Sequence, residues 1–85
     1  MKQPTTNFQE ILFTLIENGK CSIMDFPYLS GFRTRISEIK EKIHLSKIYV
    51  SGVNKFQNHY SYALHVLDPK DKRKAIELYE SSFRK

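Results

Sequence analysis

The stretch LSGFRTRISEIKEKI, residues 29–43, decides the fold of this 85-residue chain. It contains Ser30-Gly31, a pair typical of tight turns. Four apolar side chains then recur at helical intervals: Phe32, Ile36, Ile39 and Ile43. With about 100° of rotation per residue, they fall within an arc of about 60°. The spacing predicts a helix over residues 32–43 that turns one narrow apolar face toward a core.

The polar residues of this helix are basic at its start and acidic only later. Its first turn contains Arg33, Thr34 and Arg35, whereas Glu38 and Glu41 come further along. Arginines at a helix N-terminus oppose the helix dipole, so a helix selected only for stability would place acids there. A DNA-reading helix contacts bases with its N-terminal residues, through side chains of these types. We interpret the distribution as a sign of DNA contact; a solvated face of i,i+4 charge pairs is the alternative.

The chain before this stretch predicts one long helix. Between residues 8 and 18, apolar side chains follow the i, i+3, i+4, i+7 pattern of an amphipathic helix. Thr6 or Asn7 can cap its start, each with a capping-box partner three residues later. Gly19 provides a natural end.

A short strand and a second helix are predicted next. Residues 20–23 (KCSI) alternate in polarity, as a brief strand does. Asp25 would then cap a helix over about residues 26–29, with Pro27 in its first turn, where the missing N–H costs nothing. This helix, the turn at residues 30–31 and the helix over residues 32–43 would form a helix-turn-helix.

Two strands are predicted after the helix-turn-helix. Residues 47–56 are rich in β-branched and aromatic side chains, and residues 59–67 alternate strictly. Gln57-Asn58 between them predicts a hairpin turn. We expect one face of the second strand to pack on the helices, with base stacking on an exposed face as the alternative. That face holds Tyr60, Tyr62, Leu64 and Val66.

The end of the chain predicts one more helix, over residues 69–83. Asp68 is placed as its N-cap and Pro69 at its first position. Its apolar stripe contains Ala75, Ile76, Tyr79 and Phe83. This stripe would suit a core contact, or alternatively the interface of a homodimer.

The order of elements predicts an α+β winged helix-turn-helix. A three-helix core is followed by a β-hairpin wing, and the helix over residues 69–83 is an addition. We expect residues 1–85 to form a single domain, with its core over about residues 8–67, because a chain this short can build only one core.

Two segments are similar to those of small winged helix-turn-helix proteins of bacteriophages and mobile elements. They are GFRTRISEIKEKIHLSKI, with its central run TRISEI at residues 34–39, and VNKFQNHYSYALHVL. The resemblance implies DNA binding, with the helix over residues 32–43 in the major groove and the wing on the backbone or minor groove. The positions expected to contact DNA are Arg33, Thr34, Arg35, Ser37, Lys40, Lys55 and Asn58.

The charge of the chain agrees with a polyanionic partner. Fourteen Lys and Arg against nine Asp and Glu give a formal charge of +5, and the pI is near 9.4. Nucleic acid is the first partner class for such a balance. Cys21 is the only cysteine, and we find no signal peptide and no apolar run of membrane-spanning length. We therefore expect a cytoplasmic protein without a membrane partner.

No arrangement of residues suited to catalysis is evident. The three histidines and Cys21 are scattered, without the spacing of a metal site. Neither a nucleophile motif nor a glycine-rich phosphate loop is present. We expect no enzymatic activity, no cofactor and no bound metal.

The predicted function is double-stranded DNA binding, in a transcriptional or recombination regulator of a phage or mobile element. The alternative is a winged-helix module that binds a host or phage protein, for example a phage-encoded inhibitor of a host nuclease. Salt-sensitive retention on duplex DNA separates the two.

Overall fold

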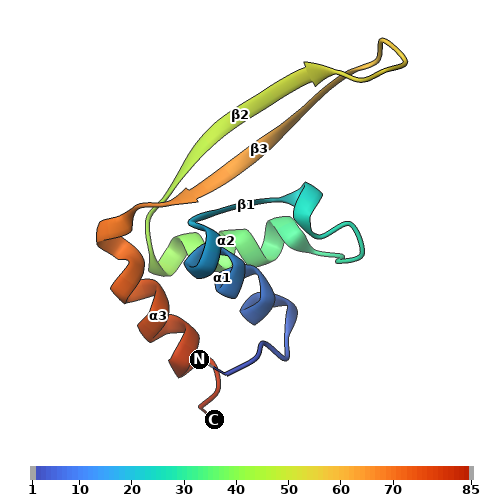
Figure 1. Cartoon of the computed structure of the whole chain (residues 1–85). Helices are drawn as coiled ribbons and strands as arrows, with labels where there is room; N and C mark the ends of the chain where they lie inside the picture. The colour runs from blue at the N-terminus through green and yellow to red at the C-terminus, as the bar shows by residue number, and fades with distance from the viewer. Residues whose placement is uncertain (1, 85) are drawn as a thin grey trace.

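Three α-helices and a three-stranded antiparallel sheet make up the computed structural model, which describes residues 2–84. The helices are α1 (Asn7–Asn18), α2 (Phe32–Lys42) and α3 (Lys72–Ser81). The strands are β1 (Lys20–Ser22), β2 (Leu45–Val53) and β3 (His59–Leu67), and two 3₁₀ turns are η1 (Ile23–Asp25) and η2 (Pro69–Asp71). The helices gather on one side, and the β2–β3 hairpin projects far beyond them (Figure 1). The predicted α+β class is therefore confirmed.

Helix α1 begins with the first of the two capping pairs that the sequence offers. The Thr6 hydroxyl accepts the Gln9 N–H at 3.2 Å, and the Gln9 side chain accepts the Thr6 N–H at 3.2 Å. The Gln9 amide also donates to the carbonyl of Ser82 at 3.3 Å, which ties the start of α1 to the end of α3. Gly19 ends the helix with φ 78°, as predicted.

The expected second helix over residues 26–29 is wrong. The Ser22 hydroxyl accepts the Met24 N–H at 3.2 Å, and the Asp25 carboxylate accepts the Ser22 N–H at 2.8 Å. The Asp25 carboxylate thus binds the residue that precedes η1, and it does not cap a helix over the residues that follow. Phe26 is buried and Pro27 lies in a turn, so the segment before α2 is a 3₁₀ turn followed by irregular chain.

Helix α2 packs through the predicted apolar face. Phe32, Ile36 and Ile39 are buried, and Ile43 is buried just after the helix ends. Gly31 precedes the helix with φ 74°, a conformation that favours glycine. These side chains join the core formed by α1, which includes Ile11, Leu12 and Leu15.

The sheet has the strand order β1-β3-β2, so β3 is central. Strand β3 has the predicted bounds, whereas β2 starts earlier and ends earlier than residues 47–56. The Asn54 side chain accepts the N–H groups of Phe56 at 2.9 Å and Asn58 at 3.1 Å, which ends the strand. The expected two-residue turn is therefore a longer loop over residues 54–58, in which Gln57 has φ 65°.

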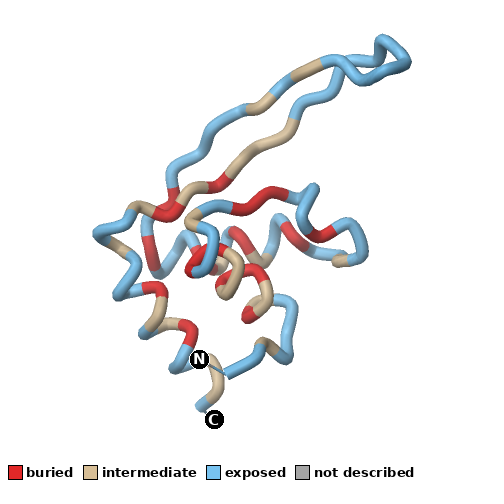
Figure 2. The backbone as a smooth tube through the Cα atoms, viewed as in Figure 1, coloured by how far each residue is buried: buried red, intermediate tan, exposed pale blue. Residues whose placement is uncertain are grey.

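The tyrosine face of β3 lies outside the core, which contradicts the expected packing. The register pairs Gly52 with Tyr60 and Val50 with Tyr62, so these residues share one face of the hairpin. Tyr60 is 46% exposed, while Cys21 and His65, on the opposite face of the sheet, are buried. The outer end of the hairpin, residues 53–61, is exposed (Figure 2). The helices cover only the opposite face, at the base of the hairpin. The predicted alternation of residues 59–67 was therefore right, but the prediction that the tyrosine face packs on the helices was wrong.

Helix α3 uses its apolar stripe inside the domain. Asp68 accepts the Lys70 N–H at 3.0 Å as predicted, but the first turn is the 3₁₀ turn η2. Tyr79 is fully buried, with its ring 5.7 Å from that of Phe13 and 5.1 Å from that of Phe83. This burial leaves Tyr79 unavailable for the homodimer contact considered from the sequence.

Candidate nucleic-acid interface

A groove of about 540 Å³ lies between α2 and the sheet. Three cations and no acid are among the described residues that line it. The polar and aromatic side chains that matter for binding are Arg33, Ser37 and Lys40 from α2, and Lys47, Tyr49 and His65 from the sheet. We call this feature the α2–hairpin groove.

Two periodicities bring these side chains together. Arg33, Ser37 and Lys40 lie at i, i+4 and i+7, so they occupy one flank of α2. Lys47 pairs with His65 across the two strands, and alternation places both on the face toward the helices. The groove is the place where the cationic flank of α2 meets Lys47 of β2.

His65 forms the floor of the groove. Its side chain is 7% exposed, its ring lies 6.0 Å from that of Phe32, and its Nδ1 has no hydrogen-bond partner. Burial lowers the pKa of His65, and the positive charges of Lys40 and Lys47 lower it further. The imidazole is therefore neutral at pH 7 in the free protein.

The buried neutral His65 predicts a loss of stability in mild acid. Its folded-state pKa lies below 6.5, so between that value and 6.5 the unfolded chain binds more protons than the folded chain. We expect the thermal midpoint to fall as pH decreases from about 7 toward 5, and to fall less in His65→Gln. Calorimetry over this range measures both, with His44→Gln, which changes an exposed histidine, as the control variant. An unchanged slope in His65→Gln would contradict the assignment.

Strand β2 adds a cation to the groove. The Lys47 ammonium lies 5.1 Å from the centre of the Tyr49 ring, and Tyr49 is 72% exposed. A cation over an aromatic face is weakly held there and stays open to a second, anionic partner. Lys47 can therefore contact a phosphate while it keeps its place over the ring.

The structure divides the predicted residues of α2 between two flanks. Arg33, Ser37 and Lys40 reach the groove, but Thr34 and Arg35 do not line it. Thr34 is exposed, and the Arg35 guanidinium forms an ion pair with Glu38 at 3.3 Å. Arg35 is thus engaged on the opposite flank, and the expectation that both arginines face one partner is not supported by their positions.

The two predicted residues of the wing lie at its tip. Lys55 is exposed, with its ammonium 5.2 Å from the centre of the Phe56 ring. The Asn58 backbone is held by Asn54, whose N–H donates to the Asn58 carbonyl at 3.0 Å. The molecule measures 48 Å along its longest axis, and the hairpin accounts for much of this length (Figure 1). Groove and tip are therefore two separate points of potential contact.

Sequence reasoning missed Lys47, Tyr49 and His65. Strict alternation in residues 59–67 does indicate that His65 faces away from the tyrosines. Which β2 residue sits beside it depends on the hairpin register, and the loop proved longer than the turn that the sequence suggested. The pairing of Lys47 with His65 needed the structure.

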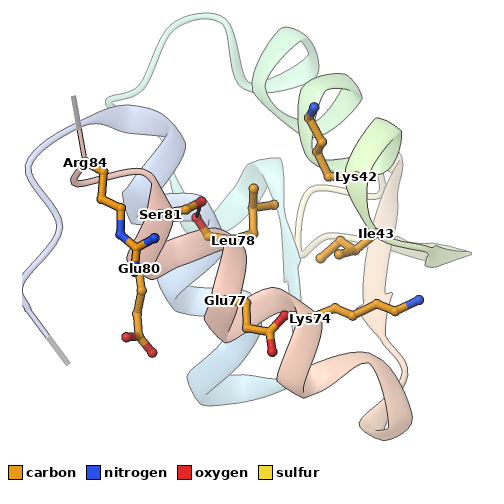
Figure 3. Close-up of a pocket in the computed structure, with 8 residues that line it drawn as sticks. All are labelled: Lys42, Ile43, Lys74, Glu77, Leu78, Glu80, Ser81 and Arg84. Carbon is orange, nitrogen blue, oxygen red and sulfur yellow. Dashed lines mark hydrogen bonds between the residues drawn. The ribbon is translucent and has the colours of Figure 1, made fainter.

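A second pocket, of about 570 Å³, lies between the end of α2 and α3 (Figure 3). Its charged residues have both signs, with Lys42, Lys74 and Arg84 beside Glu77 and Glu80. The two acids offset most of the positive charge here, so this pocket attracts a polyanion less than the α2–hairpin groove does. Four further cations lie at the start of the last helix and do not line the α2–hairpin groove: Lys70, Lys72, Arg73 and Lys74.

The described residues offer little for other chemistry. Burial and the nearby Asp25 raise the pKa of Cys21 to about 12, so this thiol is unreactive at neutral pH. Within residues 2–84, no group of three His, Cys, Asp or Glu side chains could hold a metal ion. None of the helices described has the length and apolar character that crossing a membrane requires.

Comparison with known proteins finds no matching family model, no similar curated protein and no similar solved structure.

Proposed function

We propose that the protein binds double-stranded DNA through α2 and the β2–β3 hairpin. The observation that supports this best is the α2–hairpin groove, where Arg33, Lys40 and Lys47 converge without an acid among the lining residues. Phosphate contacts from such cations supply most of the sequence-independent affinity for DNA. A cleft whose charged lining residues are all cations, beside a helix with an exposed polar face, is suited to this partner.

The dimensions of α2 suit a major groove. Eleven residues span about 16 Å, and the major groove, about 12 Å wide, admits one helix. Thr34 is exposed outside the groove and can donate to or accept from base edges, while Arg33, Ser37 and Lys40 lie on the flank that phosphates would line. We infer that α2 reads bases with its outer face and holds the backbone with this flank.

The hairpin is the proposed wing of a winged-helix domain. The strand order β1-β3-β2 and the hairpin directly after α2 support this assignment, whereas the 3₁₀ turn in place of a second helix departs from it. The two hairpin strands, β2 and β3, have nine residues each and span about 30 Å, so Lys55 and Asn58 at the tip can follow the duplex beyond the reach of α2. Regulation in a phage or mobile element is the role that the sequence resemblance suggests.

Salt dependence tests the proposed function. Arg33, Lys40, Lys47 and Lys55 are four cations that can each neutralise one phosphate, so the logarithm of the affinity should fall against log salt with a slope of about −4. Fluorescence anisotropy with a labelled mixed-sequence duplex measures this slope. No binding at low salt, or binding that does not respond to salt, would contradict the proposal.

A protein-interaction module is the second candidate, and the outer face of the hairpin favours it. Ile48 and Tyr60 lie on that face and are 51% and 46% exposed. Exposed apolar surface of this kind marks interaction sites when it is contiguous. A protein that fails to stay on immobilised duplex DNA at low salt would favour this candidate.

A further inference from the structure

The starting observation is an unpartnered polar atom at the floor of the α2–hairpin groove. The side chain of His65 is more than nine-tenths buried, lines the groove, and has no hydrogen-bond partner at Nδ1. Buried polar atoms in folded proteins nearly always have a partner, because leaving one unpaired is costly. Because no hydrogen bond holds Nδ1, the imidazole can take a partner in the groove without giving up an existing bond.

The side chains around His65 define which chemical class of partner would suit the groove. Lys40 on α2 and Lys47 on β2 lie close enough to lower the pKa of His65 by their charge. Arg33 and Ser37 line the same groove from α2. Cations and a hydroxyl, with no carboxylate among the lining residues described, are the donor set that binds an oxyanion.

We propose that the α2–hairpin groove holds one phosphate of the DNA backbone, bound by Lys40, Lys47 and the protonated ring of His65. This site depends on the proposed function for the source of its phosphate. Lys40 and Lys47 supply point charges from two different elements, and the imidazolium of His65 donates a hydrogen bond from below. The phosphate would thereby join the helix to the wing.

Binding at this site takes up a proton. In the free protein His65 is neutral at pH 7, because burial and two ammonium groups disfavour its charged form. A phosphate bound in the groove places a negative charge beside the ring of His65. This charge favours the protonated imidazole and raises the pKa of His65. The other titratable or charged side chains that face the ring from the packed elements are Arg33 on α2, Tyr49 on β2 and Cys21 on β1. Cys21 stays neutral, with a pKa of about 12.

Proton uptake makes duplex binding stronger in mild acid. Between the pKa of free His65 and that of bound His65, one linked proton changes the affinity by up to about tenfold per pH unit. We expect the wild-type protein to bind a short mixed-sequence duplex at least about fivefold more tightly at pH near 5.5 than near 7.5. His65→Gln should lose this response, and His44→Gln, which changes an exposed histidine outside the groove, should keep it.

The decisive measurement is an NMR titration of the imidazole of His65 in the wild-type protein, which does not depend on a variant folding. The pKa of His65 is measured in chloride, in sodium sulfate at matched ionic strength, and with the duplex. We expect both sulfate and duplex to raise it, and the resonances of the other two histidines serve as internal references.

The outcomes separate this site from the proposed function. A pKa of His65 that rises in sulfate without any duplex binding supports the oxyanion site while the DNA proposal fails. Salt-dependent duplex binding that leaves the pKa of His65 unmoved, or a pH response that persists in His65→Gln, overturns the phosphate site and leaves DNA binding intact. A pKa unmoved by sulfate and by duplex overturns the site in either case.

Discussion

The double substitution of Arg33 and Lys40 by alanine is expected to weaken duplex DNA binding by about 100-fold or more, without unfolding the protein. Both side chains line the α2–hairpin groove, and neither is in the hydrophobic core. Hydrogen bonds to charged groups contribute about 1.5–3 kcal/mol each, so the loss of two such bonds weakens the affinity by about 100-fold or more. Anisotropy titrations at fixed salt measure the affinity, and the salt slope should fall by about 2.

The matched control is the double substitution of Arg35 and Lys42 by alanine. It also removes one arginine and one lysine from α2, so the net charge changes by the same amount. Arg35 is paired with Glu38, and neither Arg35 nor Lys42 lines the groove. We expect only a few-fold weakening, from the loss of long-range attraction. Equal losses in the two double variants would show that the groove has no special role.

Ile39→Ala is expected to lower the free energy of unfolding by about 2–5 kcal/mol. Ile39 is fully buried on the apolar face of α2, and its side chain fastens this helix to the core that includes α1. A domain of this size has a total stability of about 5–15 kcal/mol, so the variant loses a large share of it. Chemical denaturation followed by circular dichroism measures the change.

Ile48→Ala serves as the comparison for Ile39→Ala. The same atoms are removed, but Ile48 lies on the hairpin and is 51% exposed. We expect a loss below about 1 kcal/mol there, because little apolar area returns to water and no cavity forms. A loss at Ile48 as large as that at Ile39 would contradict the open outer face of the hairpin.

Local patterns in the sequence determined much of the fold. The apolar spacing in residues 32–43 predicted the buried face of α2, and the alternation in residues 59–67 predicted both bounds of β3. The stripe that contains Tyr79 was also recognisable. These features follow from the helical and strand periods, which act between near neighbours in the chain.

Competition between local partners was harder to predict. Thr6 and Asn7 were equal candidates for capping α1. In the structure Thr6 is the cap, and its partner Gln9 also donates a hydrogen bond to the carbonyl of Ser82. Asp25 could cap a helix ahead of it or close a turn behind it, and it does the second. Short elements such as these have little intrinsic stability, so the packing of neighbouring residues decides them.

By itself, the sequence determined which residues share a face; only the tertiary structure decided which faces are covered. Tyr60 and Tyr62 share a face, as alternation requires, but the helices cover the opposite one. The same packing separates Arg33 from Arg35 and places Lys47 beside His65 at the groove. The physical reason is that periodicity is a property of one segment, whereas burial and strand register depend on contacts between segments far apart in the chain.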